Sequence, residues 1–525
     1  MTFSRGARRL LPAAASGVLL LMSFPPADFG LIGWIALVPL NLSLARATVL
    51  EGVARGLVCG AVFFGGLLPW IMGVLLRHSG IPAPLCLLPW LLLVGYLALY
   101  VALYGAALAR TSARAGLIGL AFAPALWTGL EWARGTLLTG FPWGLLGASQ
   151  HGLVPLAQAA SVGGVYGLSF LMSSFSAAVA VLVITGVRGG RGRLALCVLI
   201  AIPVAVLAWG WHRLGAGSDD GHRVMVACVQ GNSPPEPAEA EGMRILDTHI
   251  RLSREAAKRG AEIIVWAESS TPFGIDMDEP FRSALQNLAR ETGCWLIVGS
   301  VGGSASGPYY NGAFLIDPDG LRGPPYGKVH LVPYGEYVPL AELTPFVSRF
   351  VHAIGEFQPG KGTVVWTAGL TRLTPLICYE AIFPPLARMG ARAGGEVLVN
   401  LTYDGWFGGG GGPAQHLALA RMRAIETGRP LVRAAETGIS AVFDGRGRLL
   451  GSAGSGTEAL VTAEISPRQE ATPYLGVGDV VPRACAMLSL ILIAPLFLPN
   501  RKVGALLGGR SDRLSGGGRR RGGGG

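Results

Sequence analysis

Eight stretches of mostly apolar residues, most of them close to twenty residues long, constrain this chain more than any other feature. A helix needs about 20 such residues to cross the hydrocarbon layer of a bilayer. We therefore predict eight transmembrane helices, at residues 10–25, 30–47, 54–76, 84–109, 115–133, 160–186, 194–213 and 481–498. Only 14% of the 525 residues are charged, against about 25% in soluble proteins, which agrees with this prediction.

The apolar stretches divide the chain into four parts. Residues 1–215 are predicted to form a membrane domain with seven transmembrane helices, and 221–475 to form a globular domain large enough for its own core. The eighth helix, 481–498, follows. Residues 500–525 form a basic tail rich in glycine and arginine, and this composition predicts disorder.

The positive charges near the apolar stretches predict the orientation, because loops rich in arginine and lysine stay in the cytoplasm. An N-terminus in the cytoplasm places most basic loops and the tail there, and leaves Arg77, Arg134 and Arg213 near the opposite face. The globular domain then lies on the outer face. The net charge of +11 is explained by these loops and the tail, so we expect no nucleic-acid partner.

The globular region alternates strand-like and helix-like segments. Strands are predicted at residues 223–231, 261–269, 294–301, 311–320, 372–378 and 396–404, helices at 240–259, 279–292, 382–393 and 413–427, and a hairpin at 431–451. The predicted strands are apolar on both faces, which is typical of a sheet covered by helices. The expected fold is therefore a layered α/β domain.

Three of these strands end on or near a reactive side chain, namely Glu268, Cys378 and Asp404. Ligands of α/β sheets bind beyond the carboxyl ends of strands. Taken singly, each has an ordinary explanation, since a glutamate at a strand end is often a solvated cap and a lone cysteine often a packed small side chain.

The small number of lysines favours a functional role for Lys328. Of 43 basic residues only four are lysine, namely Lys258, Lys328, Lys361 and Lys502. A lysine retained against this bias offers a compact ammonium group that arginine cannot replace. Lys328 lies in an irregular segment rich in proline, glycine and tyrosine, whereas the other three are consistent with ordinary surface positions.

Glu268, Lys328 and Cys378 together predict acyl transfer through a thioester. A carboxylate can take the thiol proton as general base, the thiolate can attack a carbonyl carbon, and an ammonium can stabilise the oxyanion. His330 and His416 are available, but the sequence gives neither an obvious partner for a Cys–His pair. The seven cysteines show no disulfide or zinc spacing, and we expect no metal or cofactor.

Several motifs resemble the nitrilase (carbon–nitrogen hydrolase) superfamily, and in detail its membrane branch, the apolipoprotein N-acyltransferases. They are YGKVHLVPYGEYVP, ICYE, NLTYDGWFG and QHLALARMRAIETGRPLVRAAETG in the globular region, and EWARGTLLTGFPWGLLG and GGVYGLSFL in the membrane region. The resemblance covers residues 10–498. It implies an α-β-β-α sandwich for the globular domain.

The resemblance also implies residue roles. Cys378 would be the nucleophile, Glu268 the general base and Lys328 the oxyanion stabiliser. Glu336 would help to organise the site, and Tyr379 and Glu380 would line it. Trp406 and Phe407 would belong to a mobile loop near the acyl chain.

The sequence departs from the family pattern around this site. Ala267 stands where a proline is frequent, and Tyr403 and Glu436 stand where asparagines are common. The glycine run Gly408–Gly412 replaces residues that are usually polar, and the tryptophan often found some residues after QGN is missing. These departures surround the predicted catalytic residues and leave all three in place.

The function implied by the resemblance is transfer of an acyl chain from a membrane phospholipid to the N-terminal diacylglyceryl-cysteine of apolipoproteins. The protein would be a monomer in the bacterial inner membrane, with the catalytic domain on the periplasmic side. The alternatives are a membrane-tethered nitrilase or amidase, for which a single anchor would suffice, an inactive nitrilase-like scaffold, and a transporter. The spans contain few charged residues, which argues against a transporter.

Overall fold

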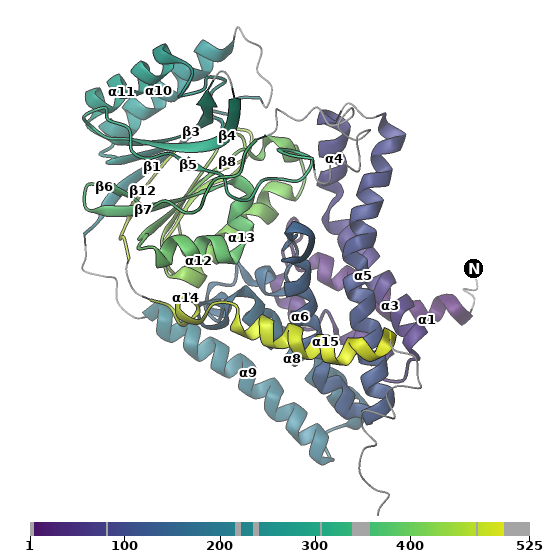
Figure 1. Cartoon of the computed structure of the whole chain (residues 1–525). Coiled ribbons are helices and arrows are strands. Elements are labelled where there is room, and N and C mark those ends of the chain that lie inside the picture. The colour runs from purple at the N-terminus through teal and green to yellow at the C-terminus, as the bar shows by residue number, and fades with distance from the viewer. Residues whose placement is uncertain are drawn as a thin grey trace, which may run out of the picture.

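The computed structural model describes residues 5–79, 82–215, 222–234, 241–304, 307–338, 357–468 and 471–497. Figure 1 shows two parts, a bundle of helices and a two-sheet α/β domain that lies against one end of the bundle. The predicted basic tail, 500–525, lies outside the described residues.

The helical part is built from the N-terminal segments and one C-terminal helix. Its α-helices are α1 (Arg5–Met22), α2 (Val38–Leu44), α3 (Val49–Leu67), α4 (Pro69–His78), α5 (Ala83–Ala115), α6 (Ala123–Arg134), α7 (Val154–Ala157), α8 (Ala160–Thr185), α9 (Gly190–Gly215) and α15 (Val480–Phe497). Its 3₁₀ helices are η1 (Gly30–Trp34), η2 (Gly116–Phe122), η3 (Leu137–Thr139) and η4 (Leu146–Gln150).

Four segments of the described chain are long and apolar enough to cross a membrane: Val49–Leu67, Ala83–Arg134, Ala160–Thr185 and Gly190–Gly215. The second contains two of the predicted spans, and the apolar helices Gly30–Leu44 and Val480–Leu496 are shorter. The number of crossings and their direction remain predictions.

Three predicted spans are divided between helices, and the one at 115–133 consists of η2 and α6. The span predicted at 54–76 is interrupted after Leu67, because Pro69 cannot donate to the helix ladder and begins a new helix, α4. The span predicted at 30–47 consists of the short η1 and α2. Hydropathy alone does not reveal such breaks.

Helices α3 and α5 pack closely along a row of small residues. Gly52, Gly56 and Gly60 are spaced four apart on α3, so they lie on one face of the helix. A Cβ atom on Gly56 would lie 2.2 Å from the carbonyl oxygen of Val101, and one on Gly52 would lie 2.4 Å from that of Gly105. Such contacts between backbones hold membrane helices together without a hydrophobic driving force.

The α/β domain contains two six-stranded sheets. The first has the order β12-β1-β2-β3-β4-β5, and the second β11-β10-β9-β8-β7-β6. The first sheet is formed by β1 (Val224–Gln230), β2 (Ile263–Trp266), β3 (Trp295–Ser304), β4 (Gly307–Ile316), β5 (Tyr326–Gly327) and β12 (Ala459–Ile465). The second is formed by β6 (Trp366–Ala368), β7 (Thr371–Ile377), β8 (Val397–Thr402), β9 (Leu431–Ala435), β10 (Ser440–Phe443) and β11 (Leu449–Ala453).

Helices cover the outer faces of both sheets. They are α10 (Gly242–Lys258), α11 (Glu279–Thr292), α12 (Pro384–Arg392) and α13 (Gly412–Thr427). The 3₁₀ helices η7 (Cys378–Ile382) and η8 (Asp404–Phe407) follow β7 and β8, and α14 (Pro473–Val477) packs on α8 of the helical part. One apolar cluster, which includes Val226 and Val399, joins the two sheets. Separate clusters join the first sheet to α10 and α11 and the second sheet to α12 and α13. The predicted α-β-β-α sandwich is confirmed.

The α12–α13 layer faces the helical part, as Figure 1 shows. Leu419, Met422 and Ile425 of α13 belong to the same buried apolar cluster as Phe63 and Leu146 of the helical part. This continuous core fixes the α/β domain on the membrane domain.

Candidate active site

The three predicted catalytic residues all follow directly or closely after a strand. Glu268 lies two residues beyond β2, Lys328 follows β5, and Cys378 follows β7. Strands β2 and β7 belong to different sheets, so the site forms where the two sheets meet. Glu268 and Lys328 are buried, and Cys378 is partly buried.

The Lys328 ammonium group lies between two carboxylates. Its Nζ donates to Glu268 Oε1 at 3.2 Å and to Glu336 Oε1 at 2.9 Å. The side-chain amide of Asn311 donates to the same two oxygens, at 2.7 Å each. The second oxygen of Glu336 accepts from the backbone N–H of Val332 at 2.7 Å. Glu336, predicted as a supporting residue, is therefore part of the same network.

The charges of this network affect both the lysine and the cysteine. Burial alone would lower the pKa of Lys328, but Glu268, Glu336 and Cys378 raise it well above its usual value, so the side chain stays an ammonium ion. Burial and the negative charge of Glu268 raise the pKa of Cys378 more than Lys328 lowers it. The resting side chain is therefore a thiol, and it needs a base before it can attack.

Cys378 occupies a left-handed backbone conformation, with a φ of +49°. A residue with a Cβ atom rarely adopts this conformation, and such residues cluster at functional sites. Cys378 is also the first residue of η7, directly after β7. The chain therefore turns sharply at the cysteine.

The carboxylate of Glu380 stabilises this turn through hydrogen bonds to the backbone. Its carboxylate is fully buried and accepts from the backbone N–H groups of Ile377 at 2.7 Å, Val329 at 2.6 Å and His330 at 3.1 Å. The Tyr326 hydroxyl donates to both of its oxygens. Through these contacts Glu380 connects the Lys328 segment to the Cys378 segment.

Tyr379 points toward the membrane domain. Its hydroxyl donates to the carbonyl of Gly140 at 3.3 Å, and its ring packs at 5.1 Å from that of Phe383. The His330 ring completes this aromatic cluster, with its centroid 3.9 Å from that of Phe383 and 5.7 Å from that of Tyr379. Burial and Lys328 lower the pKa of His330 to about 4, so this ring is neutral at neutral pH.

Trp406 and Phe407 belong to η8 and pack on α4 of the membrane domain. The Trp406 ring lies 4.6 Å from the His78 ring, and the Phe407 ring 4.7 Å from the Trp70 ring. The Arg77 guanidinium donates to the carbonyls of Trp406 at 3.2 Å and Phe407 at 2.9 Å. The loop predicted to move is thus docked on a membrane helix in this structure.

The glycine run after this loop permits close approach. Gly408 has a φ of +63°, and a Cβ atom there would lie 2.4 Å from the Arg77 guanidinium. A Cβ atom on Gly412 would lie 3.0 Å from Phe407. Polar side chains in these places would separate η8 from α4.

Gln415 connects the catalytic domain to four segments of the membrane domain. Its Oε1 accepts from the indole N–H groups of Trp70 at 3.2 Å and Trp143 at 2.7 Å. Its Nε2 donates to the carbonyls of Pro25 at 2.9 Å and Leu67 at 3.2 Å. Every hydrogen-bonding position of this buried amide is used.

The sequence did not reveal the role of His416, which follows Gln415 in α13. His416 Nδ1 lies 3.0 Å from Asp404 Oδ1 and 3.2 Å from Arg433 Nη2, and its Nε2 donates to the carbonyl of Cys378 at 3.1 Å. His416 thus contacts the backbone of Cys378, a contact that the sequence did not indicate. Asp404, Arg433 and Asn311 also support the site, and among these only Asp404, at a strand end, gave a signal in the sequence.

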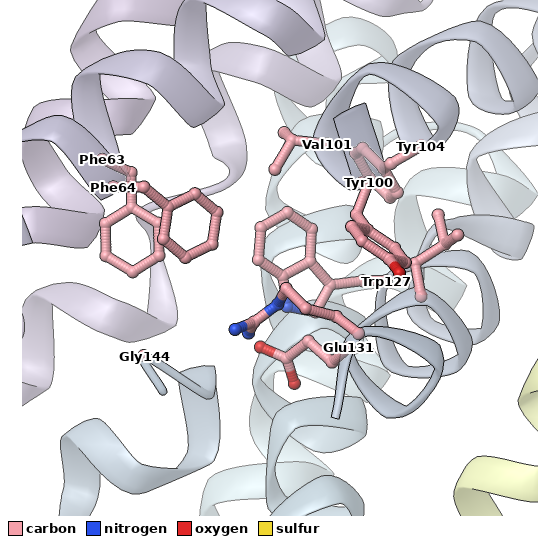
Figure 2. Close-up of a pocket in the computed structure, with 10 residues that line it drawn as sticks. Phe63, Phe64, Tyr100, Val101, Tyr104, Trp127, Glu131 and Gly144 are labelled. Carbon is pink, nitrogen blue, oxygen red and sulfur yellow. The ribbon is translucent and has the colours of Figure 1, made fainter. Parts of the chain in front are cut away.

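Figure 2 shows a separate cavity of about 20 Å³ in the membrane domain, with Phe63 and Phe64 on one side and Trp127 and Glu131 on the other. Glu131 Oε1 accepts from the backbone N–H of Leu146 at 2.8 Å. The cavity has room for about one water molecule. None of the predicted catalytic residues lines it, so it is distinct from the candidate active site.

The fold and the site define a carbon–nitrogen hydrolase domain carried on a helical membrane domain. The family model for carbon–nitrogen hydrolases matches residues 225–474, and that for the N-terminal domain of apolipoprotein N-acyltransferases matches residues 16–178. A solved amidase from Nesterenkonia sp. is 21% identical and aligns with 50% of this chain and 95% of its own, with a TM-score of 0.38.

Curated relatives extend the match to the whole protein. An apolipoprotein N-acyltransferase from Geobacter metallireducens is 37% identical over 93% of this chain and 95% of its own length. One from Allorhizobium ampelinum is 33% identical over 85% of this chain and 87% of its own. The chain therefore belongs to the apolipoprotein N-acyltransferase family, a membrane branch of the nitrilase superfamily, which confirms the resemblance.

Proposed function

We propose that this bacterial membrane enzyme transfers an acyl chain from a phospholipid to the α-amino group of the N-terminal diacylglyceryl-cysteine of apolipoproteins. The observation that carries the proposal is the buried Lys328 between Glu268 and Glu336, at the strand ends next to Cys378. The names of the curated relatives support the acceptor class.

In the first half-reaction, Glu268 takes the proton of the Cys378 thiol, and the thiolate attacks the ester carbonyl carbon of the phospholipid. Lys328 stabilises the negative oxygen of the tetrahedral intermediate. When this intermediate collapses, the C–O bond breaks and the lysophospholipid oxygen takes the proton from Glu268. The product is an acyl thioester on Cys378. The raised pKa of the Cys378 thiol fits the need for this base.

In the second half-reaction, the α-amino group attacks the thioester carbonyl and passes a proton to Glu268. The C–S bond then breaks, and the Cys378 thiolate regains the proton. The thioester must be protected from water between the two steps. The apolar rings of Trp406 and Phe407, packed on α4, suit this role.

Both substrates are anchored in a membrane, and the catalytic domain lies against the membrane domain through α13. The positive charges near the apolar stretches favour an orientation with this domain on the periplasmic side of the inner membrane. We propose that the enzyme acts there as a monomer.

A tethered amidase would use the same three residues. The extensive contact between the catalytic domain and the membrane domain, which includes the four hydrogen bonds of Gln415, argues against a tethered amidase, since a simple anchor needs no such interface.

The buried charge network argues against an inactive scaffold, because burying charges without a function costs stability.

Intact-protein mass spectrometry tests the proposal. The full-length protein in detergent is incubated with a defined phospholipid, and Cys378→Ala serves as the matched control. We expect an added acyl mass, removable by hydroxylamine, on the wild type and its absence from the variant. Adding a diacylglyceryl peptide should then discharge the acyl group onto the peptide amine. A folded wild type that forms no adduct with any phospholipid overturns the proposal.

A further inference from the structure

His249 and Glu436 form a fully buried pair between α10 and the end of β9. His249 Nδ1 donates to the carbonyl of Ile245 at 2.9 Å, and its Nε2 lies 3.1 Å from Glu436 Oε2. A carbonyl and a carboxylate both accept hydrogen bonds, so the ring carries protons on both nitrogens. The ring centroids of His249 and Trp266 lie 4.9 Å apart with the rings tilted by 51°, close enough for the indole ring to favour a cation.

The other oxygen of Glu436 fixes the loop after β1. Its Oε1 accepts from the Ser233 backbone N–H at 3.1 Å and from the Ser233 hydroxyl at 2.7 Å. The Glu436 carbonyl accepts from the N–H of Asn232 at 2.9 Å. A Cβ atom on Gly231 would lie 2.2 Å from the His249 ring and 2.6 Å from Glu436 Oε1. The pair thus occupies the space that this glycine leaves free.

The loop in turn holds Tyr403, and Tyr403 holds Glu268. The Tyr403 hydroxyl donates to the Ser233 carbonyl, and the Tyr403 backbone N–H donates to Glu268 Oε2 at 2.9 Å. The other oxygen of Glu268, Oε1, is held by Asn311 and Lys328. Both oxygens of the carboxylate are therefore fixed, one of them through the chain that begins at His249.

We propose that the buried His249–Glu436 pair positions the general base, acting through Ser233 and Tyr403 on the carboxylate of Glu268. Neither residue of the pair contacts Glu268 directly, so both are positioning residues and not catalytic ones. The inference rests on the role of Glu268 given above.

The pair also accounts for two departures from the family pattern. Tyr403 and Glu436 both stand where asparagines are common, and the structure joins them through Ser233. A glutamate in this buried place brings a negative charge, which needs a cation beside it. His249 supplies that cation, so the three residues form one unit.

Three variants test this unit. Tyr403→Phe removes the hydroxyl and keeps the ring. Glu436→Ala removes the support of Ser233. Glu436→Gln keeps an oxygen for Ser233 and offers an amide N–H to a neutral His249. The readout is the single-turnover rate constant of thioester formation on Cys378 at several phospholipid concentrations, with the melting temperature measured in parallel.

We expect Tyr403→Phe and Glu436→Ala to slow thioester formation about tenfold, because small displacements of a reacting group have large effects on rate. The phospholipid concentration for half-saturation should be unchanged. Glu436→Gln should stay within about threefold of the wild type. Tyr309→Phe, which removes the hydroxyl of an exposed tyrosine on β4, is the matched control and should react at the wild-type rate.

A Tyr403→Phe variant with the wild-type rate constant overturns the inference, even if its melting temperature falls, since the pair would then serve stability alone. If Glu436→Ala does not fold, the rate constant of thioester formation in Tyr403→Phe alone tests the inference. A wild type that forms no thioester overturns the proposed function itself, so the two failures are distinguishable.

Discussion

The imidazole Nε2 of His416 donates a hydrogen bond to the backbone carbonyl of Cys378 over a distance of 3.1 Å. A histidine thus supports the left-handed turn that carries the proposed nucleophile, Cys378, and the base proposed for its thiol is the carboxylate of Glu268. Burial and the Arg433 charge lower the pKa of His416 although Asp404 opposes them. Unlike the ring nitrogens of His249, Nδ1 of His416 also has a donor beside it, Arg433 Nη2 at 3.2 Å, so this nitrogen is unprotonated and the ring is neutral at neutral pH.

This contact predicts that a donor, and not a titrating group, is needed at position 416. His416→Gln keeps an N–H and should form the thioester within about threefold of the wild-type rate. His416→Ala leaves the carbonyl unpaired and should be about tenfold slower, because a lost hydrogen bond costs roughly 1 kcal/mol or more. Single-turnover mass spectrometry measures both. If His416→Gln is as inactive as Cys378→Ala, the histidine carries a proton in the reaction.

Asp404 predicts an acid limit of stability. Burial raises the pKa of this carboxyl, but Arg433 and His416 lower it further, to about 2. A folded pKa below the unfolded value of 3.8 means that Asp404 stabilises the fold above pH 3.8, by about 2 kcal/mol. This contribution is lost as the pH falls toward 2. Denaturant unfolding at pH 3 to 7 measures it.

We expect the difference in unfolding free energy between the wild type and Asp404→Asn to be constant above pH 5 and to shrink below pH 4. Asp247→Asn, on the exposed face of α10, is the matched control and should track the wild type. A difference that grows on acidification contradicts the assignment.

Lys328 should not tolerate arginine, although arginine is the usual cation of this chain. Its side chain is 1% exposed, and its ammonium is shared by two carboxylates and cannot be replaced by the larger planar guanidinium without moving them. Lys328→Arg should lower the rate of thioester formation at least about a hundredfold. Lys361→Arg, at an exposed position, is the control and should be unaffected. Comparable rates for both variants would mean that only the charge matters.

The hydrogen bonds of Gln415 should stabilise the interface between the catalytic domain and the membrane domain. Gln415→Leu leaves two indole N–H groups and two carbonyls without their partner, each at a cost of about 1–3 kcal/mol where no water replaces it. We expect a lower melting temperature and faster hydrogen exchange in η8 and the start of α13. Gln286→Leu, on α11, is the control. Unchanged exchange in the Gln415 variant would show that apolar packing alone joins the domains.

Local signals in the sequence were sufficient for many elements of the α/β domain. Helix α11 was predicted near residues 279–292, which are its observed bounds. Asp278 caps its N-terminus, with an Oδ1 that accepts from the N–H of Phe281 at 2.8 Å, so this boundary is set by a local contact. Gly293 ends it in the left-handed conformation. The strand ends that carry Glu268 and Cys378 were predicted from the apolar runs that precede them.

Features set by distant contacts were not predictable. Asn311 lies inside β4, and nothing in its local sequence indicates that it bridges Glu268 and Glu336. Gln415 and Trp143 are 272 residues apart and meet only when the domains pack. Strand β12 was missed because its place in the sheet depends on β1, which precedes it by more than 200 residues.

The pairing of β1 with β12 brings the two ends of the α/β domain together. Val224 at the start of the α/β domain lies opposite Ile465 at its end, so the chain enters and leaves the domain at one edge of one sheet. Helix α9 ends at Gly215, nine residues before Val224, and α15 begins at Val480, fifteen residues after Ile465. The catalytic domain is therefore an insert between α9 and α15 whose two ends lie side by side, so the chain passes into it and out of it through neighbouring strands.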